Sequence, residues 1–107
     1  MEITQYSIVL VNLDPTIGSE IKKTRPCVII SPDEMNKYLK TVVLAPITTN
    51  LKAYPTRVKI NHNGKKGMIA MDQIRTVDKS RVIKILGTLG ANEISICKDV
   101  LRETYVE

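Results

Sequence analysis

The sequence contains no phenylalanine and no tryptophan, and its 107 residues include one histidine. A core without these two aromatic side chains must be filled by valine, isoleucine and leucine, together with four tyrosines and four methionines. The single histidine, His62, and the lack of a Cys or His pair at ligand spacing exclude the standard zinc constellations. Because His62 adjoins the Asn63-Gly64 pair, we expect its side chain to be exposed in a turn rather than catalytic.

Other signatures are missing as well. Neither a Walker loop nor a GxGxxG motif occurs, so nothing supports a nucleotide cofactor. At the N-terminus the longest apolar run is four residues, and no basic segment precedes it. These features exclude a signal peptide and a membrane span there. We therefore expect a cytoplasmic protein with no membrane association, no cofactor and no metal.

Cysteine is scarce, and Cys27 and Cys97 both stand at apolar positions. This placement favours buried free thiols over a disulfide framework. A hydrophobic content of 43% and a charged content of 25% are typical of a globular domain, and we assign residues 1–107 to a single one. The net charge of +5 permits a polyanionic partner such as nucleic acid without requiring one.

Short apolar runs bounded by turn residues predict that strands dominate the fold. The Asn63-Gly64 pair, flanked by alternating apolar and polar residues, is the strongest short-range signal for a hairpin. Runs of consecutive apolar residues without alternation are typical of buried strands. In addition to the hairpin, the expected strands are residues 8–12, 27–31, 41–47 and 81–86.

Two helices are expected. Ser31, Pro32 and Glu34 have the spacing of a capping box with proline at the first helical position, which predicts a short helix. After Gly90, apolar residues recur at spacings of three and four, which predicts an amphipathic C-terminal helix. The expected fold class is therefore mainly β: a small, mostly antiparallel barrel or curled sheet with a terminal helix.

A long charged loop, residues 13–25, separates the first two expected strands. A hairpin needs two to five turn residues, and this connection is about twice that length. Pro26 holds the backbone of Arg25 extended, and the planar guanidinium of arginine is suited to binding two phosphate oxygens. Lys22 and Lys23 stand beside it. From the residues alone, a phosphate-binding cluster and a solvated charge cluster are equally good interpretations.

Two further polar groups interrupt apolar segments. Thr48 and Thr49 follow the apolar run that ends at Ile47, where they are placed either for binding or as an ordinary entry into a loop. Asp72 and Gln73 follow another apolar stretch, where a carboxylate is costly unless it is paired or at the surface. An ion pair with Arg75 or another arginine is the structural alternative to a catalytic role.

Taken together, four segments resemble one family. They are VNLDPTIGSEIKKTRPCVIIS, VVLAPITT, DQIRTVDKSRV and LGTLGANEISICKDVL, and they cover nearly the whole chain in order. The sequence resembles the MazF/PemK-type toxins, which are endoribonucleases of bacterial toxin–antitoxin pairs. The resemblance implies an SH3-like curled antiparallel barrel of the PemK/CcdB type, a homodimer, and a cognate antitoxin, which we expect to be acidic. It also implies metal-independent cleavage of single-stranded mRNA at short sequences.

The resemblance assigns roles to individual residues. Arg25 and Thr48 match the catalytic pair of the family, and Asp72 matches an acidic position used as a base in some members. Some members also have an arginine two residues before this acid with a proposed acid role, whereas this chain has Ala70, so the general acid is open. Expected RNA-binding residues, in the long loop and beside the catalytic positions, are Ser19, Glu20, Lys22, Lys23, Thr49 and Gln73.

A non-enzymatic barrel is the rival hypothesis. It would be a gyrase-directed toxin or a nucleic-acid-binding module, since fold alone does not determine function. The presence of both Arg25 and Thr48 favours the enzyme.

Overall fold

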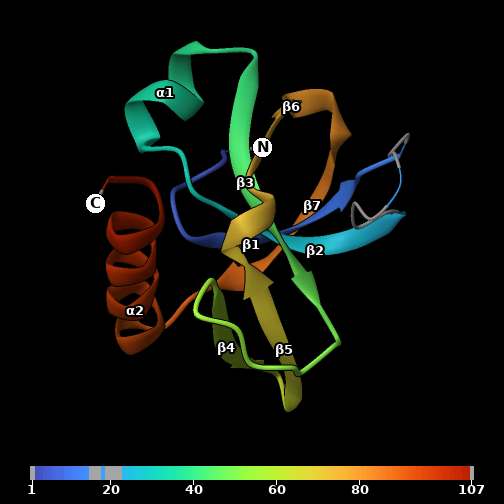
Figure 1. The fold of residues 1–107 in the computed structure, drawn as a ribbon. Helices are drawn as coiled ribbons and strands as arrows, with labels where there is room; N and C mark the ends of the chain where they lie inside the picture. Colours follow the sequence, from blue (N-terminus) through green and yellow to red (C-terminus); the bar gives the residue numbers. More distant parts are fainter. Residues whose placement is uncertain (1, 15–17, 19–22, 107) are drawn as a thin grey trace.

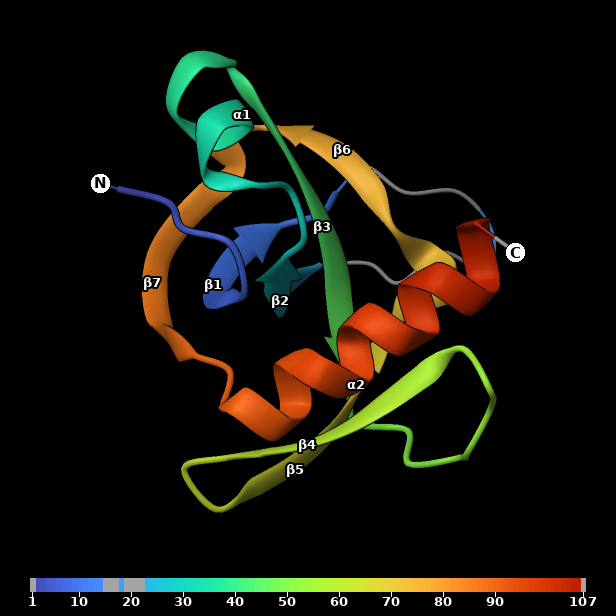
Figure 2. The same cartoon turned by 90° about the vertical axis from the view of Figure 1, so that its left-hand side faces the viewer.

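The chain folds into a curled antiparallel sheet with a helix packed across one side (Figures 1 and 2), as seen in a computed structural model that describes residues 2–14, 18 and 23–106. The helices are α1 (Asp33–Tyr38) and α2 (Ala91–Leu101). Two short 3₁₀ helices are η1 (Met71–Gln73) and η2 (Lys79–Arg81), and a π-helical segment, η3 (Arg102–Val106), follows α2. The strands are β1 (Ser7–Asn12), β2 (Thr24–Ile29), β3 (Thr41–Thr48), β4 (Arg57–His62), β5 (Lys65–Ala70), β6 (Arg75–Asp78) and β7 (Val82–Thr88).

The strands hydrogen-bond in the order β4-β5-β3-β2-β1-β7, and β6 pairs with the first half of β3. Every pairing is antiparallel. The sheet curls into a half-barrel, and α2 lies across β4 (Figure 2). The expected mainly β, curled architecture with a C-terminal helix is confirmed.

Two apolar clusters hold the sheet, one for each face, because successive residues of a strand point to opposite faces. One cluster contains Val9, Cys27 and Leu44, and the other contains Val28, Ile69 and Cys97 of α2. Both cysteines are buried and free, as predicted. Burial raises the pKa of each thiol to about 12, so both remain protonated.

The hairpin prediction is confirmed. Asn63 and Gly64 both adopt left-handed backbone angles, with φ of 52° and 78°, as a two-residue type I′ turn requires. The turn sets the register of β4 and β5, which begins at the pair His62 and Lys65.

Other boundaries differ from the expected ones. β2 begins three residues before the apolar run, at Thr24, so Arg25 lies on a strand. The predicted capping box is wrong, because the N-cap of α1 is Pro32 and makes no side-chain cap. The Ser31 hydroxyl instead contacts the Asn36 side chain and accepts a hydrogen bond from the Val43 N–H. No helix in the described part of the chain is long and apolar enough to cross a membrane.

Candidate active site

Arg25 and Thr48 come from neighbouring strands. Cys27 of β2 pairs with Pro46 of β3, and continuing this antiparallel register by two residues brings Arg25 opposite Thr48. Directly opposed residues point to the same face of a sheet. This extension of the register puts Arg25, which is half-buried, and Thr48 on one face of the sheet, and their catalytic roles stay predictions.

The same face continues across the next two strands. Thr48 pairs with Met68 of β5, and Met68 pairs with Lys59 of β4. Arg57 lies two residues before Lys59 on β4 and pairs with Ala70. Because alternate residues of a strand point to the same face, Arg57 and Lys59 share a face. The face that carries the predicted catalytic pair thus also carries a second arginine, Arg57, which the sequence analysis did not identify.

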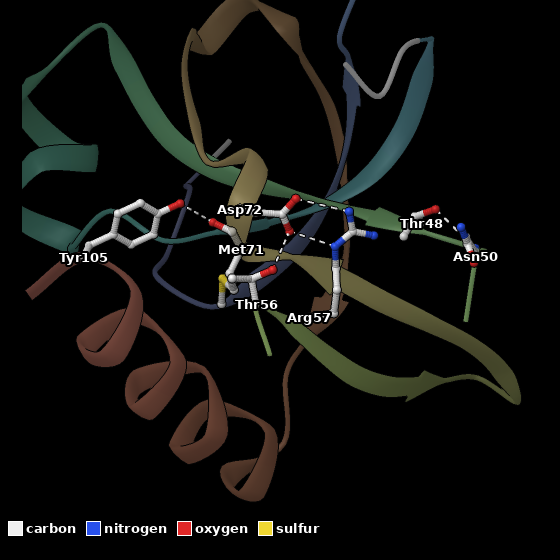
Figure 3. Close-up of polar contacts among 7 residues, drawn as sticks. All are labelled: Thr48, Asn50, Thr56, Arg57, Met71, Asp72 and Tyr105. Carbon is white, nitrogen blue, oxygen red and sulfur yellow. Dashed lines mark hydrogen bonds and ion pairs between the residues drawn. The ribbon is translucent and has the colours of Figure 1, made fainter. Parts of the chain in front are cut away.

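Asp72 lies in η1, directly after β5, and binds Arg57 through both carboxylate oxygens (Figure 3). Arg57 Nε lies 2.7 Å from Oδ1 and Nη2 lies 3.2 Å from Oδ2. The Thr56 hydroxyl donates to the same Oδ1 over 3.1 Å. The sequence left open whether Asp72 would pair with Arg75 or with another arginine. Its partner is Arg57, whereas Arg75 Nη1 donates to the Leu13 carbonyl.

This pairing keeps Asp72 ionised. The hydrogen bonds from Arg57 lower the pKa of the Asp72 carboxyl below its usual value, with a further lowering by Thr56, and partial burial opposes them. The same contact raises the pKa of Arg57. The result is a fixed, oppositely charged pair whose arginine side chain is 12% exposed and whose carboxylate is 36% exposed.

The lowered pKa of Asp72 predicts a pH-dependent contribution to stability. A carboxylate whose folded pKa lies below its unfolded pKa stabilises the fold above the unfolded value, and that contribution is lost as pH falls through the folded value. Because solvent screens the half-exposed pair, we expect at most about 1 kcal/mol. Urea unfolding of wild type and Asp72→Asn should show a difference at pH 7 that disappears near pH 2. A difference independent of pH would contradict this account.

The end of the chain contacts the same turn. The Tyr105 hydroxyl donates a hydrogen bond to the Met71 carbonyl, next to Asp72 (Figure 3). On the other side, the Arg57 guanidinium lies over the Tyr54 ring, 5.3 Å from its centre. The Arg57–Asp72 pair is therefore held from the β3–β4 connection, from η1 and from the C-terminal segment.

Hydrogen bonds join the two ends of the long loop, where the structure describes its residues. The Leu13 N–H donates to the Lys23 carbonyl over 3.1 Å, and the Lys23 N–H donates to Asp14 Oδ1 over 2.9 Å. Arg81 also donates to the carbonyls of Asn12 and Asp14. These contacts fix where the loop leaves β1 and where it returns to Arg25.

A pocket of about 320 Å³ opens beside Arg25. Apolar side chains of several strands form its walls, and polar and basic groups also line it: Arg25, Thr49, His62, Asn63, Lys65 and Lys66. His62 differs from the expected exposed residue, because it is half-buried and its ring packs on Gly87. A Cβ at Gly87 would lie 2.6 Å from His62 Cε1.

The residues predicted to bind RNA lie in different parts of the structure, and some lie outside the described residues. Thr49 lines the pocket, and Gln73 lies in η1 beside Asp72. Lys23 is exposed at the end of the loop, in a left-handed conformation with φ of 70°. Ser19, Glu20 and Lys22 lie outside the described residues. In the described ranges, no group of three or more His, Cys, Asp or Glu side chains forms a possible metal site.

The chain is thus a small, curled antiparallel half-barrel (Figure 2), and Arg25, Lys65 and Lys66 give the pocket a basic lining. The model of the family described as PemK-like, MazF-like toxin of type II toxin–antitoxin systems matches residues 4–105. The chain belongs to this family. Its predicted family membership is confirmed.

Individual relatives agree with this result. A protein of Staphylococcus epidermidis named endoribonuclease MazF is 38% identical over 98 residues, which cover 86% of this chain and 82% of the relative. The crystal structure of MazF from Deinococcus radiodurans has a TM-score of 0.88 at 24% identity, covering 100% of this chain and 99% of that one. A mycobacterial endoribonuclease solved with its cognate antitoxin has a TM-score of 0.80 at 20% identity, covering 94% and 92%. At the level of the family, the expectation of an endoribonuclease toxin is confirmed.

Proposed function

We propose that this chain is a sequence-specific endoribonuclease that cleaves single-stranded mRNA without a metal ion, leaving a 2′,3′-cyclic phosphate and a 5′-OH. The observation that supports the proposal is the register of β2 and β3, which pairs Cys27 with Pro46 and, extended by two residues, aligns Arg25 with Thr48. Family membership and the name of the S. epidermidis relative support the same reaction class.

The chemistry suits these side chains. When the neighbouring 2′-OH attacks phosphorus, an O2′–P bond forms and the bond to the 5′-oxygen breaks. The 2′-OH proton passes to solvent water, the leaving 5′-oxygen takes a proton from solvent water, and negative charge develops on the non-bridging oxygens in between. The permanently charged guanidinium of Arg25 stabilises that charge. Thr48 Oγ1 accepts a hydrogen bond from the Asn50 N–H over 3.2 Å (Figure 3), which directs the hydroxyl proton elsewhere. That proton is then available to a phosphate oxygen.

The pocket, which Arg25 lines but Thr48 and Arg57 do not, is suited to an unpaired base of the substrate. Single-stranded RNA is recognised through bases that are unstacked, packed on side chains and hydrogen-bonded at their edges. Here the apolar walls suit a base, Thr49, His62 and Asn63 offer hydrogen bonds, and Lys65 and Lys66 suit the flanking phosphates. In this proposal the pocket contributes to sequence preference, together with the long loop.

The direct test incubates purified protein with a long RNA in excess EDTA. We expect cuts at a small set of sequences, because the reacting groups come from the protein alone. RNA that stays intact with EDTA but is cut with Mg²⁺ would overturn metal independence. RNA that stays intact in both would favour the rival hypothesis, a gyrase-directed toxin or a nucleic-acid-binding module, and a gyrase inhibition assay would then separate these two.

The chain is further proposed to act as a cytoplasmic homodimer. The terminal strand of the sheet, β7, exposes Ile83 and Ile85. Exposed apolar side chains on an unpaired strand edge favour association with another chain. Sedimentation at micromolar concentration that gives only the 12.0 kDa species would contradict this proposal.

The proposed inhibitor is a cognate antitoxin with an acidic, extended segment that covers the Arg25–Thr48 site. Opposite charge speeds association and makes it salt-sensitive, and this chain carries a net charge of +5. We expect a candidate antitoxin encoded beside this protein to compete with a non-cleavable RNA. Simultaneous binding of both, without loss of affinity for either, would show that inhibition does not work by occlusion.

A further inference from the structure

Arg57 occupies a particular place in the site. The family resemblance leaves position 70 without the arginine that some members carry, since this chain has alanine there. In the hairpin register, the residue directly opposite Ala70 is Arg57, so its side chain leaves the sheet on the same face. A guanidinium is thus supplied to this part of the sheet from β4 instead of β5.

We propose that Arg57 is a second phosphate-binding arginine of the active site, positioned by Asp72 and Thr56, and that it contacts the scissile phosphate together with Arg25 and Thr48. The inference rests on the proposed ribonuclease function and adds to it a residue beyond Arg25 and Thr48. Asp72 is then a positioning residue and not the proton acceptor.

The guanidinium is oriented for this role. Nε and Nη2 are used by Asp72, whereas Nη1 has no hydrogen-bond acceptor among the described residues. In Figure 3 the end of the guanidinium that is not bound to Asp72 points to the side on which Thr48 lies. Thr48 stands two strands away and two rows along the sheet, which is about 10 Å by about 7 Å between backbones. A phosphate between the two residues is within reach of the long arginine side chain.

The contacts of Asp72 explain why it is assigned to positioning. Both of its oxygens already accept hydrogen bonds, two from Arg57 and one from Thr56. A carboxylate bound in this way is a weak proton acceptor, because protonation would break the bonds that hold it. The same bonds prevent Arg57 from rotating away, and a bidentate fork fixes its direction more firmly than a single contact does.

The experiment uses a short RNA with one cleavage site and compares wild type, Arg57→Ala, Arg57→Lys and the control Arg102→Ala, which removes an exposed arginine at the end of α2. Loss of a donor to the developing charge should lower kcat about 10- to 100-fold, with a smaller effect on KM. Arg57→Lys, which keeps the charge without the fork, should retain more activity. If Arg57→Ala does not fold, the rate of Arg57→Lys relative to wild type is the measurement that tests the proposal.

A second readout separates contact with the phosphate from a structural role. In substrates with one non-bridging oxygen of the scissile phosphate replaced by sulfur, wild type and Arg102→Ala should discriminate between the two stereoisomers. Discrimination should fall in Arg57→Ala. A slower variant with unchanged discrimination, or equal rates for both isomers in wild type, would overturn the contact.

A double-mutant cycle tests the role of Asp72. If Asp72 acts through Arg57, Asp72→Asn slows wild type but adds nothing in the Arg57→Ala background. Additive losses would show that Asp72 acts independently, as a base. Wild type that cuts no RNA would refute the proposed function itself, whereas normal cleavage by Arg57→Ala would refute this inference alone.

Discussion

Replacing Arg25 with alanine is expected to lower the rate of RNA cleavage by a factor of about 30 or more, and to abolish toxicity, while the protein stays folded. Arg25 is half-buried, and the extended register of β2 and β3 puts it on one face of the sheet with Thr48. We propose that its guanidinium stabilises charge that develops on the phosphate in the transition state. Removing one such donor costs about 2–4 kcal/mol, which is about a 30- to 1,000-fold loss in rate. Single-turnover cleavage of a short RNA measures the loss.

Arg102→Ala is the matched control for this prediction as well, since it removes the same charge from a side chain that is 61% exposed and is paired with Asp99 instead of Asp72. It should cleave at the wild-type rate, and circular dichroism should show that both variants retain the sheet. An Arg25→Ala protein that is folded and cuts RNA at close to the wild-type rate would remove Arg25 from the catalytic site. A matching loss in Arg102→Ala would mean that net charge, rather than position, is what matters.

Replacing Thr48 with valine has the second largest expected effect. Valine keeps the branched shape of threonine at the end of β3 but removes the hydroxyl, whose proton is directed away from the Asn50 N–H. A hydrogen bond to a charged group contributes about 1.5–3 kcal/mol, so we expect about a 10- to 150-fold loss of cleavage rate.

Two variants make the interpretation specific. Thr48→Ser keeps the hydroxyl and should retain most of the activity. Thr41→Val makes the same change at the other end of β3 and should have no effect on cleavage. If Thr48→Ser is as impaired as Thr48→Val, packing at the end of β3, and not the hydroxyl, is required.

Much of the architecture was predictable because the local signals agree with the fold. Unbroken apolar runs marked the buried strands, and the Asn63-Gly64 pair marked the hairpin and its register. The short strand β6 was not predicted, since its four residues carry an arginine and an aspartate and gain strand geometry by pairing with β3. The start of α1 was misplaced because the Ser31 hydroxyl binds the Asn36 side chain and the Val43 N–H instead of capping the helix.

The candidate site was drawn from the sequence in part. The family resemblance singled out Arg25, Thr48 and Asp72, whose roles stay predictions, but the pairing of Arg57 with Asp72 was not foreseen because the two are separated by 15 residues. A signal did exist: a two-residue turn at Asn63-Gly64 pairs His62 with Lys65, and counting back brings Arg57 opposite Ala70. The packing of His62 on Gly87 carried no such signal, because it arises from the curl of the whole sheet.

The measurement that tests the central claim most directly is the identity of the ends left by cleavage. RNA cut by the wild-type protein in EDTA should carry a 5′-OH on the downstream fragment and a 2′,3′-cyclic phosphate on the upstream one. The downstream fragment should then be labelled by polynucleotide kinase without prior dephosphorylation, and Arg25→Ala should produce far fewer such ends in the same time. Fragments with a 5′-phosphate and a 3′-OH would mean that water, and not the neighbouring 2′-OH, attacks phosphorus, and would contradict the mechanism built on Arg25, Thr48 and Arg57.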